Sequence, residues 1–220
     1  MRIANNYKKI ISSLPKDVRV IVAAKTRTPE EIIQVIEAGA KDIGHNYVQE
    51  AINSFSALGD FSKEVNWHMI GHLQKNKINK ALEIFDFIQT VDSYDKAVAI
   101  NKRCDDNIDV LIEINSGDEK SKSGLTKNIE QIFNTVEKII SLNHINLCGL
   151  MTMGPVVDNP ESLRPFFKET FNIFKLLSDD NELGKYMKIL SMGMSDSYKI
   201  ALEEGSNMVR IGSAIFGPRR

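Results

Sequence analysis

Short apolar segments alternate with longer amphipathic segments along all 220 residues of this chain. The apolar segments are rich in Val, Ile and Leu and are too short for buried helices, so we expect strands. Eight are expected, at residues 18–24, 42–44, 67–71, 85–91, 110–114, 147–152, 189–193 and 208–211. Strict alternation of strands and helices predicts a parallel sheet covered by helices. Eight such units in this length favour a closed (β/α)8 barrel, the TIM-barrel fold, over an open sheet.

Helix signals occur between the expected strands. Thr28 is suited to capping, Pro29 to the first helical position, and the acids that follow to the positive end of the helix dipole; Gly39 is a natural stop. Further helical patterns cover 48–58, 95–104, 129–142, 161–177 and 197–204. Segment 4–14 is an extra N-terminal helix, expected to cover the side where little chain follows the last strand. We expect one domain over residues 1–220.

Composition excludes several classes of protein. The formal net charge is −1, so nothing favours a nucleic acid or a membrane surface as partner. No apolar run approaches membrane-spanning length, and the two cysteines, Cys104 and Cys148, form no disulfide framework or metal-ligand spacing. His68 and His72 lack an acidic residue that would complete a metal site. These features predict a cytoplasmic protein without a metal.

Two glycine- and serine-containing segments end the last two expected strands, at residues 190–195 and 208–214. Glycine lets the backbone approach a ligand closely, and free N–H groups there hold anions. In a (β/α)8 barrel, the loops after strands 7 and 8 commonly bind a phosphate group. The sequence therefore predicts a phosphate site at this end of the barrel.

Three more side chains lie at or near the ends of expected strands. Lys25 ends the first strand, where it could form a Schiff base with an aldehyde or an ion pair with a carboxylate. Arg210, inside the last strand, could lie in a buried ion pair or donate to a ligand, keeping a pyridine nitrogen unprotonated. Asn46 could bind a ligand or cap a helix. A lysine, a phosphate site and an arginine together suggest pyridoxal 5'-phosphate; a phosphosugar lyase would need only the first two.

Several motifs, in order and in register from about residue 20 onward, resemble the pyridoxal phosphate homeostasis proteins. They lie at residues 24–26, 44–50, 67–74, 121–125, 149–152, 191–196 and 208–218. No single motif is specific, but together they are. The chain departs from the family pattern at His45, where the family usually has Glu, and at Ser213, where it usually has Thr.

The resemblance implies a single-domain barrel like the N-terminal domain of alanine racemase, with pyridoxal 5'-phosphate as cofactor. Lys25 would carry the cofactor as an aldimine, Asn46 would approach the ring, and Arg210 would face the pyridine nitrogen. The expected phosphate site consists of Ser191, Ser195, Gly212 and Ser213, and Met192 is also expected to bind the cofactor. The resemblance also implies a role in vitamin B6 homeostasis, in which the cofactor is buffered and delivered to apo pyridoxal phosphate-dependent enzymes.

The residues favour a carrier over an enzyme. Racemisation needs an acid or base on each face of the substrate, and racemases of this type take the second group, a tyrosine, from a β-domain that we do not expect here. Arg210 would also leave the ring a poor electron sink, since a protonated nitrogen draws in carbanion charge. We therefore expect no catalytic residue and a monomeric carrier. The alternative is a weak pyridoxal phosphate-dependent amino-acid racemase with Tyr47 as its second base.

Overall fold

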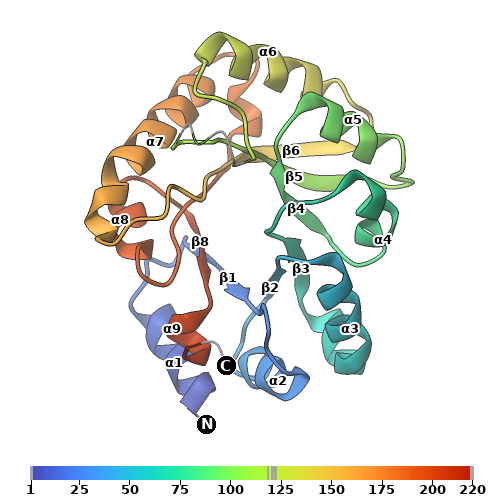
Figure 1. Ribbon diagram of the computed structural model, residues 1–220, viewed down its shortest axis with the longest axis vertical. Coiled ribbons are helices and arrows are strands. Elements are labelled where there is room, and N and C mark those ends of the chain that lie inside the picture. Colours follow the sequence, from blue (N-terminus) through green and yellow to red (C-terminus); the bar gives the residue numbers. More distant parts are fainter. Residues whose placement is uncertain (1, 118, 120–122, 219–220) are drawn as a thin grey trace.

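The computed structural model describes residues 2–117, 119 and 123–218. Eight parallel strands form a closed barrel in which each strand pairs with the next and β8 pairs with β1 (Figure 1). The strands are β1 Arg19–Ala23, β2 Asp42–His45, β3 Asn66–Met69, β4 Phe87–Val91, β5 Ile108–Glu113, β6 Ile145–Met151, β7 Ile189–Ser191 and β8 Met208–Ile211. The predicted (β/α)8 barrel is confirmed.

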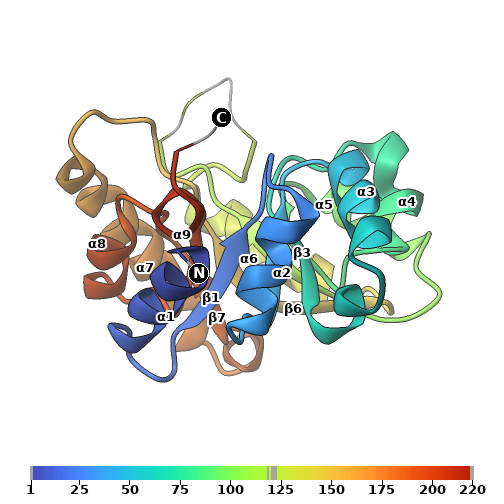
Figure 2. The same cartoon turned by 90° about the horizontal axis from the view of Figure 1, so that it is seen from below.

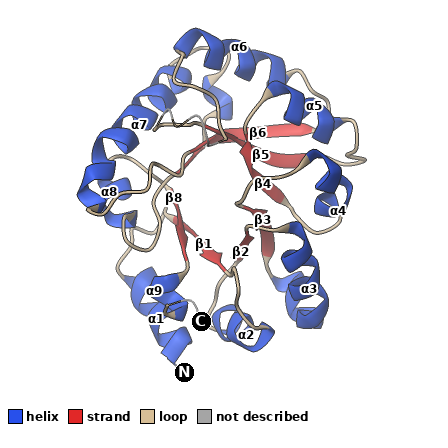
Figure 3. Cartoon of the chain, viewed as in Figure 1, coloured by secondary structure: helices blue, strands red, loops and turns tan. Residues whose placement is uncertain are grey.

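Helices surround the strands on the outside of the barrel (Figure 3). They are α1 Arg2–Ser12, α2 Pro29–Glu37, α3 Val48–Leu58, α4 Ile78–Leu82, α5 Tyr94–Asn101, α6 Ile129–Ile140, α7 Arg164–Ser178, α8 Tyr198–Glu203 and α9 Ser213–Phe216. The start of α2 follows the sequence signal: the Glu31 amide donates to Thr28 Oγ1 (3.3 Å) and the Thr28 amide donates to the Glu31 carboxylate (3.1 Å). This capping box satisfies two backbone donors at the helix end.

Some boundaries differ from the sequence-based prediction. Strand β4 begins at Phe87 and not at Phe85 as predicted. Phe85 follows the end of α4, and its amide still bonds to the carbonyl of Ala81 in that helix. Strand β7 ends at Ser191, and Gly193 turns the chain with a φ of 88°. The short helices α4 and α9 were not predicted, because four or five residues carry too little periodicity to mark a helix.

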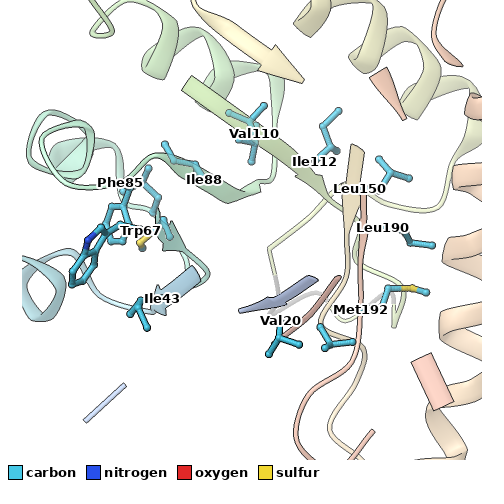
Figure 4. Packing of buried hydrophobic residues seen from close by; sticks show 14 of the residues in the cluster. Val20, Ile43, Trp67, Phe85, Ile88, Val110, Ile112, Leu150, Leu190 and Met192 are labelled. Atoms are coloured by element: carbon cyan, nitrogen blue, oxygen red, sulfur yellow. The ribbon is translucent and has the colours of Figure 1, made fainter. Parts of the chain in front are cut away.

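Buried side chains form two layers. The outer layer, between strands and helices, includes Val20, Ile43, Trp67, Ile88, Val110, Leu150, Leu190 and Met192 (Figure 4). The inner layer fills the barrel with Ile21, Ile70, Phe87, Leu111, Cys148, Met151 and Met208. Alternation along β1 explains the division, because Val20 and Val22 belong to the outer layer and Ile21 to the inner one.

The N-terminal helix α1 lies beside α9 and α2 at the side of the barrel (Figure 2). Asn6 Nδ2 donates to the carbonyl of Ile215 (2.9 Å), which ties the helix to the segment after β8. This position agrees with the expectation that an extra helix covers this side. None of the described helices has the length and apolar character needed to cross a lipid bilayer.

Candidate functional site

A cavity of about 340 Å³ opens beyond the carboxyl ends of the strands, within the size range of small-molecule sites. Its walls combine apolar side chains with three cationic groups, a carboxylate, an amide and two hydroxyls. The lining residues are Ala23, Lys25, Arg27, Asn46, Ile70, Met153, Met194, Ser195, Asp196, Arg210, Gly212 and Ser213. They come from loops far apart in the sequence, which the closed barrel brings to one end.

Six of the eight predicted site residues line this cavity: Lys25, Asn46, Ser195, Arg210, Gly212 and Ser213. Ser191 and Met192 do not line it. Ser191 is fully buried inside the barrel, where its hydroxyl bonds to Gln89 Oε1 (2.8 Å). Met192 packs in the outer layer, and its amide bonds to the carbonyl of Met208 (3.0 Å). Because neither residue lines the cavity, the direct ligand contacts proposed below are those of the other six.

Lys25 is placed at the barrel mouth by a tight turn after β1. Thr26 adopts a φ of 63°, which is rare for a β-branched residue, and its amide donates to the carboxylate of Glu50 in α3. Such strained backbone is typical of functional sites. Lys25 is partly exposed, and its Nζ lies 4.9 Å from the centre of the Tyr47 ring, a cation–π contact. The amine therefore reaches the cavity without an ion-pair partner among the described residues.

Arg210 points from β8 into the cavity floor and is 3% exposed. Its Nη1 donates to the carbonyl (3.0 Å) and hydroxyl (2.6 Å) of Ser191, and its Nη2 donates to the carbonyl of Thr152 (2.8 Å). Burial lowers the pKa of Arg210 to about 10, opposed by the charge of Glu113, so the guanidinium stays cationic at neutral pH. Within the described chain, no carboxylate forms an ion pair with Arg210, so neutral acceptors hold it in place.

Donors gather at the corner of the cavity formed by Ser195 and the residues after β8. The amides of Gly212 and Ala214 both donate to Ser195 Oγ (3.1 and 3.2 Å), and the Ser213 side chain is nearby on the same wall. Arg27 adds positive charge to this wall, held by a bond from Nη2 to the carbonyl of Gly217 (2.7 Å). Amides, hydroxyls and a guanidinium are the donors that a phosphate needs.

Asn46 lies on the wall of the cavity, between β2 and α3. It does not cap α3: the N-cap is Tyr47, which makes no side-chain capping bond. A Cβ on Gly71 would lie 2.3 Å from the Asn46 carbonyl oxygen. The glycine that follows Ile70 is therefore required for the loop after β3 to pack against Asn46.

Four further residues line the cavity that were not predicted from the sequence: Arg27, Asp196, Met153 and Met194. Arg27 follows Lys25 by two residues in the same loop, which was the available signal. No cluster of three or more His, Cys, Asp or Glu side chains in the described part of the chain could hold a metal ion. Of the resembling motif at 121–125, residues 121 and 122 lie outside the described residues.

His45 faces away from the cavity. It is fully buried, its ring stacks on Trp67 (centroids 5.6 Å apart), and neither ring nitrogen has a hydrogen-bond partner among the described residues. Burial lowers its pKa to about 4, so the ring is neutral at pH 7. The departure from the usual Glu therefore changes the packing behind β2 and not the lining of the cavity.

His45 is expected to make the fold sensitive to acid. The unfolded chain binds a proton at this residue below pH 6.5, whereas the folded chain binds one only near pH 4, so stability is lost as pH falls between these values. By pH 5 the loss is about 2 kcal/mol relative to pH 7. Urea unfolding at both pH values measures it. His45→Phe keeps the stacking and should lose about 2 kcal/mol less; equal losses in the two proteins would contradict the assignment.

Comparison with known proteins shows the family to which the chain belongs. The family model of the alanine racemase N-terminal domain matches residues 1–220. The pyridoxal phosphate homeostasis protein of Aquifex aeolicus is 37% identical over 206 residues, covering 92% of this chain and 87% of that protein. The protein of the same name from Synechocystis is 32% identical and covers 97% of each chain. The chain thus belongs to the pyridoxal phosphate homeostasis proteins, a family with the alanine racemase N-terminal fold.

Solved structures show the same fold. PipY of Synechococcus elongatus, solved without pyridoxal phosphate, is 27% identical with a TM-score of 0.90, over 98% of this chain and all of that chain. PipY with pyridoxal phosphate bound gives a TM-score of 0.87 at 26% identity. Alanine racemase of Clostridium difficile shares the fold at 18% identity, with a TM-score of 0.77, and this chain covers 56% of it.

Proposed function

We propose that this protein binds pyridoxal 5'-phosphate, holds it through Lys25 and serves the homeostasis of this cofactor. The observation that carries the proposal is the meeting of an amine, a buried guanidinium and a set of phosphate donors around one cavity of about 340 Å³. The names of the curated relatives and the bound state of PipY support it.

Each group fits one part of the cofactor. The Lys25 amine would leave the face of Tyr47 and condense with the aldehyde to an imine, releasing the aldehyde oxygen as water. Ser195, Gly212 and Ser213 would hold the phosphate, with Arg27 adding charge. Arg210 would donate to the pyridine nitrogen, and Asn46 would contact the ring or its substituents. The amides of Gly212 and Ala214, which donate to Ser195 Oγ in this structure, would donate to phosphate oxygens instead.

A carrier fits the residues better than an enzyme. Arg210 remains protonated, so a pyridine nitrogen facing it stays unprotonated and withdraws little charge from a carbanion. A second candidate, a weak amino-acid racemase, rests on the position of Tyr47 beside Lys25.

We propose a monomer that acts in the cytoplasm and passes its cofactor to apo pyridoxal phosphate-dependent enzymes.

Absorption spectroscopy and borohydride reduction test the proposal. The protein loaded with pyridoxal phosphate is expected to be yellow, and reduction should leave a pyridoxyl group on Lys25 in the mapped peptides. Incubation with L-amino acids should give racemisation no faster than free cofactor gives. A colourless, unmodified protein would contradict cofactor binding, and racemisation lost in Tyr47→Phe would support the second candidate.

A further inference from the structure

A continuous chain of side-chain hydrogen bonds crosses the barrel interior below the cavity. Arg210 Nη1 donates to Ser191 Oγ (2.6 Å), and Ser191 Oγ bonds to Gln89 Oε1 (2.8 Å). Gln89 Nε2 reaches His68 Nδ1 (3.2 Å), and His68 Nε2 reaches Asp42 Oδ1 (2.9 Å). All five residues are buried, and three of them, Ser191, Gln89 and His68, are fully buried.

The chain has one consistent direction. Ser191 accepts from Arg210, so its single hydroxyl hydrogen goes to the oxygen of Gln89. The Gln89 NH₂ group then faces His68 Nδ1, which must accept. His68 is therefore neutral and carries its proton on Nε2, which donates to the Asp42 carboxylate.

Arg19 fixes the far end of the chain. Its Nε donates to Asp42 Oδ2 (3.0 Å) and its Nη2 to Asp42 Oδ1 (2.5 Å). Together with His68 it lowers the pKa of Asp42, opposing the effect of burial, so the carboxylate stays ionised. An ionised Asp42 accepts only, so His68 Nε2 must donate to it, which agrees with the direction that follows from the Arg210 end.

A chain of polar side chains inside the barrel is less stabilising than apolar packing, so its presence points to a role. Barrel interiors are filled mainly by branched apolar side chains. Here, the loss of one link leaves two buried polar groups unpaired, and each then carries a desolvation penalty. The hydrogen-bond chain ends at Arg210. Among the described residues, this is the one guanidinium that both lies inside the barrel and lines the cavity.

We propose that Gln89 and His68 are positioning residues for Arg210: through Ser191 they hold its guanidinium in the orientation that meets the ring of the bound cofactor. The proposal rests on the proposed function. Neither residue lines the cavity itself, so they act on the cofactor indirectly, through the hydrogen bonds that lead to Arg210.

Gln89→Leu tests the hydrogen-bond chain, because leucine has a similar size and breaks both links of Gln89 in that chain. The substitution also removes the bond from Gln89 Nε2 to Met208 Sδ (3.3 Å). The variant is expected to bind pyridoxal 5'-phosphate about tenfold more weakly and to shift the visible absorption band of the bound cofactor. Thr170→Val is the matched control: Thr170 is fully buried, and its hydroxyl donates to the Phe166 carbonyl (2.9 Å) in α7, outside the barrel. The affinity of the Thr170→Val variant for pyridoxal 5'-phosphate should change less than twofold, and the visible absorption band of the bound cofactor should not shift.

A second measurement needs neither a variant nor the cofactor. Nitrogen NMR of His68 in the unloaded protein at pH 7 is expected to show an unprotonated Nδ1 and a protonated Nε2. The opposite tautomer or a cationic ring would overturn the proposed chain. Equal binding and an equal spectrum in Gln89→Leu would also overturn it. Failure of the unaltered protein to bind the cofactor at all would instead overturn the proposed function.

Discussion

Lys25→Ala is expected to abolish covalent attachment of pyridoxal phosphate and to weaken its retention by about a hundredfold or more. Lys25 is the lysine that lines the cavity, and its amine has no ion-pair partner among the described residues. The remaining donors at Ser195 and Gly212 would still hold the phosphate, so weak binding should persist. Equilibrium dialysis and the visible spectrum measure retention and the imine separately.

Lys25→Arg is the matched control for this prediction. It keeps the positive charge and a cation–π contact with Tyr47, but it has no amine that forms an imine. Loss of the imine absorption band in both variants, with equally weak retention of the cofactor, would show that the covalent bond and not the positive charge holds the cofactor. A pyridoxyl group found on the Lys25→Ala protein after borohydride reduction would place the anchor on another lysine and overturn the assignment.

Strong local signals made most of the fold predictable from the sequence. Strand β8 has the predicted bounds, because Met208–Ile211 is apolar apart from Arg210 and stops at a glycine. The start of α2 was readable because a capping box is a contact between neighbours. Lys25, Arg210 and the Gly212–Ser213 pair also lie around one cavity at the carboxyl ends of the strands, as their positions in the sequence predict.

The positions of Ser191 and Met192 could not be read from the sequence. Both belong to a resembling motif, but the side of the strand that faces the ligand depends on how the closed barrel sets the register of β7 against β8. The hydrogen-bond chain has the same origin, since Gln89 and Ser191 are 102 residues apart in the sequence. Contacts of this kind depend on the whole barrel, whereas capping boxes and strand ends depend on a few neighbours.

Gly149→Ala is expected to destabilise the fold by about 4 kcal/mol or more. A Cβ there would lie 1.9 Å from the carbonyl oxygen of Ile189, and the φ of 145° is unfavourable for a side chain. The register of β5 against β6 shifts beside this glycine, which places Cys148 as an extra residue. Strand β6 then leads to Thr152, whose carbonyl holds Arg210. Urea unfolding measures the loss.

Gly39→Ala separates conformational strain from collision. Gly39 has a φ of 106°, but a Cβ there would meet no atom within 4 Å. This control should cost only about 1–2 kcal/mol, and it should leave cofactor binding unchanged because Gly39 follows α2, away from the cavity lining. If both variants lost the same stability, close contact between β6 and β7 would not be the reason for glycine at 149. A larger loss in Gly149→Ala, together with weaker cofactor retention in the folded fraction, would tie this contact to the carbonyl that holds Arg210.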